Sequence, residues 1–305
     1  MRNGAAHLMV FGANLIWGLG YPLYNMAMPH YIEPYQMLTL STIATALLTL
    51  LAIPFEGAKA KQQSVARRDI LTFVGAALLI AVGRKGILML GLSMTSAIDC
   101  AIIATLNPVV VLIFSALLGF EIFTRGKLFG VILGLAGAVG VILSGANGAH
   151  ATSGVEGNLL IVLCAILAAV YMLWFKSLLK RYEPIVALRW MFLLAAVAVV
   201  PFGVKPMMEW DYSQIPTKVW FAIAYLAIMT TYIPNLLLQS GLRRLQPTVT
   251  SVYTYVQPAT AVIFSIALGI DKLRVETAIF GALIFAGVWI VIRAQRRVTM
   301  RVENK

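Results

Sequence analysis

Apolar stretches follow one another along almost the whole chain, and short polar segments separate them. Ten stretches are long enough to cross roughly 30 Å of hydrocarbon as helices. They cover residues 7–28, 34–54, 70–92, 95–119, 126–144, 156–178, 184–204, 216–241, 246–269 and 275–294. Pro34, Pro184 and Pro216 stand where three of the stretches begin, and a helix tolerates proline at its start. The pattern therefore predicts an all-α integral membrane protein with ten transmembrane helices.

The chain also matches itself at a spacing of 150 residues. The segment 108–121 (PVVVLIFSALLGFE) recurs as 258–271 (PATAVIFSIALGID), and the same spacing relates Tyr21 to Tyr171. An internal duplication in a strongly apolar chain is typical of transporters built from two related halves. We therefore predict a first five-helix repeat over 1–150 and a second over 151–305, which ends in a basic tail. An odd number of spans in each half makes the two repeats inverted relative to each other.

The composition indicates that lipid is the main solvent of the chain. Hydrophobic residues make up 60% of the sequence and charged residues 12%, whereas an ordinary soluble domain has about 25% charged residues. A soluble chain of this length could not bury so much apolar surface. The two cysteines, Cys100 and Cys164, lie in apolar stretches without CxxC or metal-ligand spacing. We expect both to be small buried hydrophobic residues, and we expect no metal and no cofactor.

The net charge of +12 comes mostly from short loops and the C-terminal tail. The basic residues do not form a face interleaved with aromatics, so nucleic acid is not an expected partner. If the N-terminus is cytoplasmic, seventeen basic residues fall on the cytoplasmic side: Arg2, Lys59, Lys61, Arg67, Arg68, Arg125, Lys127, Lys176, Lys180, Arg181, Arg243, Arg244, Arg293, Arg296, Arg297, Arg301 and Lys305. Four fall on the opposite side: Lys205, Lys218, Lys272 and Arg274. This positive-inside bias predicts a multi-pass protein with both termini in the cytoplasm.

Several short motifs resemble those of one family of membrane proteins. They are Asn14-Leu15-Ile16-Trp17-Gly18 with Tyr21-Pro22, Leu92-Ser93-Met94-Thr95-Ser96-Ala97, Asn107-Pro108, Gly119-Phe120-Glu121-Ile122, Gln257-Pro258 and Gly269-Ile270-Asp271. In this order the motifs are similar to those of the drug/metabolite transporter superfamily, in particular its EamA-type ten-helix members. The resemblance implies a basket of ten helices around a central substrate cavity, alternating access and, for bacterial members, the inner membrane. Similar members include exporters of amino acids and other metabolites.

Arg84 and Lys85 are charged residues inside the third predicted span. A cation that faces lipid at this depth costs roughly 2.5–3.5 kcal/mol on insertion scales. One hypothesis is that Arg84 or Lys85 binds an anionic group, such as a substrate carboxylate. The alternative is a structural pair with Asp99, with Lys85 reaching toward the membrane surface. Asp99, the one acidic residue clearly inside a predicted span, is also the candidate for proton coupling. We expect Arg189, near the cytoplasmic start of its span, to reach the lipid headgroups.

Aromatic and amide side chains recur on single faces of several predicted helices. Asn14, Trp17 and Tyr21 in the first helix are spaced at i, i+3 and i+7. Apolar walls with a few polar groups are the usual lining of a site for a small organic molecule. The alternative is an interfacial aromatic belt, which we favour for Tyr24, with ordinary interhelical hydrogen bonds. The candidate substrate-binding residues are Asn14, Trp17, Tyr21, Arg84, Lys85, Tyr171, Trp174, Tyr232, Asn235, Gln239, Tyr253 and Gln257.

Prolines in the interior of predicted spans are candidate hinges. They are Pro108, Pro234 and Pro258. A proline inside a helix introduces a kink and frees a carbonyl group. We expect helices to bend at these positions during alternating access, and a static kink that shapes packing is the alternative.

Small residues at a spacing of four predict close packing of the fifth and tenth helices. They are Gly130, Gly134 and Ala138 in the fifth, and Ala282 and Ala286 in the tenth. We interpret this spacing as part of the scaffold.

Together these features predict a secondary transporter and no enzyme, since no HExxH motif or glycine-rich phosphate loop occurs. The expected substrate is a small metabolite, above all an amino acid or a related carboxylate-bearing compound, moved across the bacterial inner membrane by alternating access. The open alternatives are a carrier of sugars, nucleosides or drug-like molecules, and a membrane receptor or scaffold without transport. The expected partners are the small-molecule substrate and membrane lipid. The proton is a candidate coupling ion, and facilitated diffusion is the alternative. Because one chain carries both halves of the pore, we expect a monomer.

Overall fold

The computed structural model describes residues 2–117, 124–146, 154–175, 178, 181–242, 245 and 253–303, and over these residues it is helical without any strand. The elements are α1 (Arg2–Ala27), α2 (Pro34–Leu51), η1 (Ile53–Phe55), α3 (Ala58–Gln62), α4 (Arg67–Ala76), η2 (Ala77–Arg84), α5 (Lys85–Ser93), α6 (Ala97–Ala104), α7 (Asn107–Leu117), α8 (Arg125–Ala146), α9 (Val155–Trp174), α11 (Pro184–Glu209), η3 (Tyr212–Gln214), α12 (Thr217–Ile228), α13 (Tyr232–Leu242), η4 (Tyr253–Tyr255), α15 (Val256–Ala267) and α16 (Val275–Glu303). In this part of the chain, five helical segments are long and apolar enough to cross a membrane: Pro34–Leu51, Arg67–Ser93, Ala97–Phe114, Pro184–Glu209 and Thr217–Gly241. The predicted all-α class is confirmed.

Several helices extend beyond the apolar stretches that predicted them. α11 continues to Glu209, past the predicted end at 204, and α16 continues to Glu303, past the predicted end at 294. Hydropathy marks only the part of a helix that suits hydrocarbon, whereas backbone hydrogen bonds continue into the polar region. The predicted span 246–269 is described from residue 253 onward. Glu121, Lys176, Lys180, Arg243, Arg244 and Lys305 lie outside the described residues.

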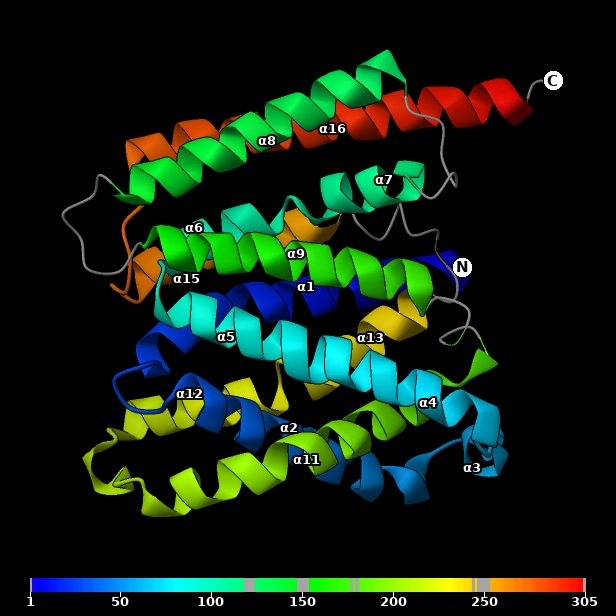
Figure 1. Cartoon of the computed structure of the whole chain (residues 1–305), viewed down its shortest axis with the longest axis vertical. Coiled ribbons are helices and arrows are strands. Elements are labelled where there is room, and N and C mark those ends of the chain that lie inside the picture. Colours follow the sequence, from blue (N-terminus) through cyan, green and yellow to red (C-terminus); the bar gives the residue numbers. More distant parts are fainter. Residues whose placement is uncertain are drawn as a thin grey trace.

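The long helices run back and forth along one direction, and both termini lie at the same end of the bundle, together with α3 (Figure 1). Helices of the two halves of the chain are interleaved. α2 packs against α11, while α1 packs against α13 and α15. One buried cluster surrounds α1, α5 and α6, and a second lies between α4 and α11. The interior is therefore built from side chains of both halves.

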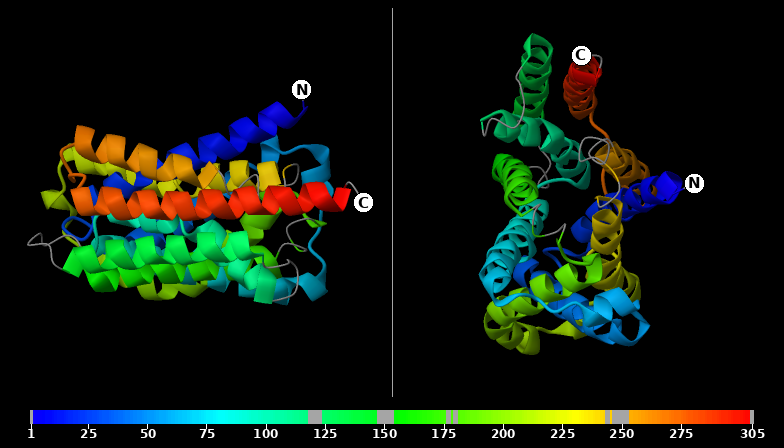
Figure 2. Two further views of the ribbon diagram at one scale, coloured as in Figure 1. Left: turned by 90° about the horizontal axis from the view of Figure 1, so that it is seen from above. Right: turned by 90° about the vertical axis from the view of Figure 1, so that its right-hand side faces the viewer.

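α8 and α16 form a pair that is set apart from the other helices (Figure 2). Their backbones meet at glycines, since a Cβ added at Gly130 would lie 2.5 Å from the carbonyl oxygen of Gly287. This contact confirms the predicted close packing of the two helices. The predicted face of α16 was wrong, because Ala282 and Ala286 are exposed and Gly287 faces α8 instead.

Breaks interrupt several of the apolar helices. η2 is a π-helix between α4 and α5, residues 105–106 separate α6 from α7, residues 229–231 separate α12 from α13, and the 3-10 helix η4 precedes α15. Pro108, Pro234 and Pro258 each lie in the first turn of the helix that follows a break. Three of the breaks thus lie within the five residues before a proline, where the missing N–H and the proline ring disturb the helix. This agrees with the kinks predicted at these positions. Their role as moving hinges stays a prediction.

Candidate functional site

A buried hydrogen-bond network joins α1 to α15. The Tyr21 hydroxyl donates to Gln257 Oε1 at 3.0 Å, and Gln257 Nε2 donates to Asn14 Oδ1 at 2.6 Å. Gly18 permits this close approach, because a Cβ there would lie 2.8 Å from the carbonyl oxygen of Gln257. Three predicted site residues from the two halves of the chain are therefore brought together.

The break between α12 and α13 is bonded to α1. Trp17 Nε1 donates to the Thr230 carbonyl at 2.9 Å, and the hydroxyls of Tyr24 and Thr230 form a hydrogen bond of 3.2 Å. Tyr24 is buried, so the expectation of an interfacial belt residue was wrong. Thr230 was missed because a single hydroxyl in an apolar stretch carries no pattern, although the nearby Pro234 signals an irregular helix.

Lys85 is the first residue of α5, and its side chain lies between α2 and the break that separates α12 from α13. Its Nζ donates to Ser41 Oγ and to Thr231 Oγ1, each at 2.7 Å, and lies 5.7 Å from the ring centroid of Phe192. Lys85 therefore does not reach the membrane surface, and that alternative was wrong. The sequence did not indicate Ser41 and Thr231 as the hydrogen-bond partners of Lys85.

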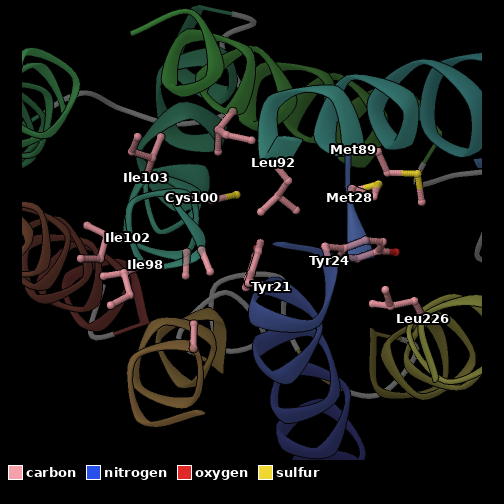
Figure 3. Packing of buried hydrophobic residues seen from close by; sticks show 14 of the residues in the cluster. Tyr21, Tyr24, Met28, Met89, Leu92, Ile98, Cys100, Ile102, Ile103 and Leu226 are labelled. Carbon is pink, nitrogen blue, oxygen red and sulfur yellow. The ribbon is translucent and has the colours of Figure 1, made fainter. Parts of the chain in front are cut away.

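Arg84, the last residue of η2, is partly buried, and its charge acts on Tyr21, Cys100 and Cys164. Cys164 Sγ also donates to the Arg84 carbonyl at 3.4 Å. Figure 3 shows that Tyr21 of α1 and Cys100 of α6 are directed into the same region. Arg84 Nε is buried without a hydrogen-bond partner, and within the described residues Arg84 forms no ion pair. A buried donor of this kind marks a position that an anionic group could occupy.

Asp99 lies in the first turn of α6 and is 1% exposed. It forms an ion pair with Arg274, and Thr277 Oγ1 donates to Asp99 Oδ1 at 3.0 Å. The expected pair between Arg84 and Asp99 is therefore not formed. Asp99 is bonded to residues at the start of α16, whereas the charge of Arg84 acts on residues of α1, α6 and α9.

The candidates on α13 bond mainly to groups near their own helix. Asn235 Nδ2 donates to the Thr231 carbonyl at 2.6 Å, and Gln239 is buried. Tyr232 lies close enough to an ion pair between Glu56 and Arg189 for both charges to act on it. Arg189 therefore binds a buried carboxylate, and the expectation that it reaches the headgroups was wrong. 

Among the described residues, no hydrogen bond joins Tyr171, Trp174 or Tyr253 to the network around Tyr21. The Tyr171 hydroxyl donates to Met191 Sδ at 3.4 Å, and the Tyr253 hydroxyl forms a hydrogen bond of 2.7 Å with His7 Nδ1. Trp174 is 60% exposed, at the last residue of α9. Three residues rotate a helix by about 300°, so Trp174 and Tyr171 point in directions about 60° apart.

Two depressions lie at the periphery of the molecule. One, of about 370 Å³, is lined by residues from Leu273 to Ala282, and the other, of about 630 Å³, by residues from Val200 to Glu209. Neither is lined by a predicted substrate-binding residue. In the interior, Tyr21, Gln257 and Asn14 bond to one another across the space between α1 and α15. Among the described side chains, no group of three His, Cys, Asp or Glu could hold a metal ion.

The sequence and the fold have known relatives. The EamA-like transporter family matches the chain twice, over residues 4–143 and 155–293. The uncharacterized transporter YyaM of Bacillus subtilis (strain 168) is 22% identical over 289 residues, which cover 94% of this chain and 93% of YyaM. An uncharacterized transporter of Archaeoglobus fulgidus is 23% identical over 297 residues, which cover 97% of this chain and 100% of that protein. A crystal structure of a protein 22% identical to the chain matches 97% of it, and 99% of that structure, with a TM-score of 0.66.

The fold, the apolar helices and these matches define a membrane-embedded, multi-pass helical transporter. The chain belongs to the EamA-like transporter family, and thus to the drug/metabolite transporter superfamily.

Proposed function

We propose that this protein is a secondary transporter that moves a small carboxylate-bearing metabolite, such as an amino acid, across the bacterial inner membrane by alternating access. The observation that carries the substrate class is the Arg84 guanidinium, whose Nε is buried without a partner. A carboxylate bound there would accept charge-assisted hydrogen bonds, in the bidentate geometry that arginine favours. It would also compensate a partly buried charge that forms no ion pair among the described residues.

The neutral groups near Arg84 form the rest of the proposed site. The Tyr21 hydroxyl and the Gln257 amide bond to each other between α1 and α15, and either can instead bond to a substrate placed between these helices. Trp17 and Tyr24 are bonded to Thr230 in the break between α12 and α13. A movement of α1 on substrate binding would therefore also move this break in the second half. The central cavity would open as these bonds exchange partners.

We further propose that the chain consists of two inverted five-helix repeats, 1–150 and 151–305. The two separate matches to the family, over 4–143 and 155–293, support this division. The breaks support it too, because residues 105–106 and the end of η4 at 255 are related by the same spacing of 150 as the sequence repeat.

The proposed orientation places both termini in the cytoplasm. The charge distribution favours it, with seventeen basic residues predicted on that side and four on the other. Protons are the proposed coupling ion and Asp99 the candidate coupling residue, and a single chain forms the proposed pore.

Uptake into liposomes tests the proposal. Purified protein is reconstituted, and uptake of a labelled amino-acid panel is measured with and without a pH gradient. We expect saturable uptake that falls at least tenfold in Arg84→Gln, because a charged hydrogen bond is worth about 1.5–3 kcal/mol. Arg68→Gln is the matched control, since Arg68 is exposed on α4, and we expect wild-type uptake. A rate that depends on the gradient in wild type and not in Asp99→Asn would support proton coupling.

The other outcomes point to other functions. If folded protein takes up no amino acid or related acid, the proposed substrate class is wrong, and sugars, nucleosides and drug-like molecules are tested next. If interior thiol labels react from only one side of the membrane in every condition, the protein is a receptor or scaffold.

A further inference from the structure

We infer that the substrate carries a net negative charge, so that the site selects organic anions over zwitterionic amino acids and neutral metabolites. The inference rests on the proposed transport function and narrows its substrate class. It follows from the balance of charges in the interior.

The buried acidic side chains already have cationic partners. In the described part of the chain, the carboxylates that are less than 10% exposed form these ion pairs: Asp99 with Arg274, Glu56 with Arg189, and Asp69 with Arg181. None of them is bonded to Arg84 or Lys85. The interior region around η2 and α5 therefore holds two basic side chains and, over the residues described, no carboxylate that pairs with them.

Neutral groups solvate Lys85 without neutralising it. Ser41 and Thr231 accept two hydrogen bonds from Nζ, and an ammonium group has three hydrogens to donate. The Phe192 ring adds a cation–π contact at 5.7 Å. Such contacts reduce the cost of burying a cation in the membrane, but they leave the net charge of the site unchanged.

A zwitterion cannot correct this imbalance. It brings one carboxylate and one ammonium, so the net charge of the occupied site stays positive. An anion lowers the net charge whichever protonation state Lys85 adopts. A monoanion neutralises Arg84 when Lys85 is uncharged, and a dianion neutralises both residues when Lys85 is protonated. Buried charge is costly unless it is paired, so the anion forms the more stable complex.

The two basic residues have different parts in this selection. Consecutive residues on a helix point about 100° apart. The charge of Arg84 acts on Tyr21 and Cys164, and its buried Nε has no hydrogen-bond partner, while Lys85 Nζ donates to Ser41 and Thr231. Arg84 is therefore the direct ligand of the anionic group. Lys85 acts on the bound anion through its charge, and at a separation of several ångström this effect changes affinity by roughly tenfold.

Binding of a matched set of acids to the full-length protein in detergent tests the inference. Aspartate and asparagine have nearly the same shape and differ by one negative charge, and succinate lacks the ammonium group of aspartate. Thermal unfolding is followed as each compound is titrated. We expect succinate and aspartate to bind at least tenfold more tightly than asparagine. We expect Arg84→Gln to weaken both acids by roughly 10- to 100-fold, and Lys85→Gln to weaken succinate more than aspartate.

Two controls keep the test decisive. Arg68→Gln should leave all three affinities unchanged. Arg84→Lys retains the charge, so it should keep the preference for aspartate over asparagine even if Arg84→Gln fails to fold. Equal or tighter binding of asparagine, or no stabilisation by either acid or by a pool of mono- and dicarboxylates, would overturn the inference.

The inference and the proposed function fail in different ways. Uptake of neutral amino acids into liposomes, with loss in Arg84→Gln, would support the carrier and overturn anion selection. Binding of aspartate in preference to asparagine, without movement of any acid across a sealed membrane, would support anion selection and contradict transport.

Discussion

Tyr21 and Tyr171 are separated by the repeat spacing of the chain, yet their hydroxyls have different partners. Tyr21 donates to an amide on α15, and Tyr171 donates to a methionine sulfur on α11. The residue that corresponds to Arg84 in the second half is Pro234, which carries no charge. Positions that are related by the sequence repeat therefore carry different side chains and form different contacts, so the candidate site is chemically asymmetric.

Replacement of Gln257 tests the buried network at the residue level. Gln257→Leu removes the acceptor of Tyr21 and the donor to Asn14, and it leaves two buried polar groups without partners. We expect a loss of about 1–3 kcal/mol in the free energy of unfolding, measured by denaturant titration in micelles. Addition of Tyr21→Phe to this variant should recover part of the loss, since it removes one of the unpaired groups. Unchanged stability of Gln257→Leu would contradict the network.

The pairing of α8 with α16 is decided by glycine. A side chain at Gly287 would meet the carbonyl oxygen of Gly130 at 2.5 Å, and backbone cannot move aside as the end of a flexible side chain can. Helix pairs in membranes gain stability from such close approach, because lipid provides little hydrophobic drive for association.

Gly287→Val tests this element. We expect the variant to lose about 1–3 kcal/mol of stability through overpacking, measured by thermal unfolding in detergent. Ala282→Val, on the exposed face of the same helix, is the matched control and should unfold like the wild type. Equal stability of the two variants would show that α8 and α16 do not meet at this face.

Charged contacts join the two halves of the molecule at the end that holds both termini. Lys59 and Glu183 are 3.2 Å apart, and Asp69 and Arg181 are 3.0 Å apart. The Tyr182 hydroxyl donates to Asp69 at 2.7 Å, and burial together with this hydrogen bond raises the pKa of Tyr182. The hydroxyl therefore remains a donor at neutral pH. These contacts hold α3 and the first turn of α4 against the residues that lead into α11.

Removal of these charges should open this end of the molecule. In a chain whose two native cysteines are replaced by alanine, Gln239→Cys reports access to the interior, because Gln239 is buried on α13. We expect Glu56→Gln with Asp69→Asn to raise its rate of labelling several-fold, since each change breaks an ion pair between the halves. Lys205→Cys is exposed and should label at an unchanged rate. No change at Gln239→Cys would show that these pairs do not close the bundle.

Sequence patterns predicted where the helices lie along the chain better than they predicted which residues individual side chains contact. The starts of α2 and α11 were predicted at Pro34 and Pro184, where the structure places them. The prolines indicated three of the breaks, whereas the π-helix η2 was not predicted, because it contains no proline and has the hydropathy of a continuous helix. The hydroxyls that bind Lys85 were missed because Ser41 and Thr231 lie 44 and 146 residues away in the chain.

The sequence by itself determined the helical membrane class, the family motifs and the presence of charges inside the third span. These properties depend on the hydropathy of local stretches of sequence, which determines whether a stretch is stable as a helix in lipid. Only the tertiary structure decided that Asp99 pairs with Arg274, that Trp174 faces outward and that Arg84 lacks an acidic partner among the described residues. Such partnerships depend on which helices are neighbours and on their relative rotation, and a side chain's own stretch of sequence specifies neither.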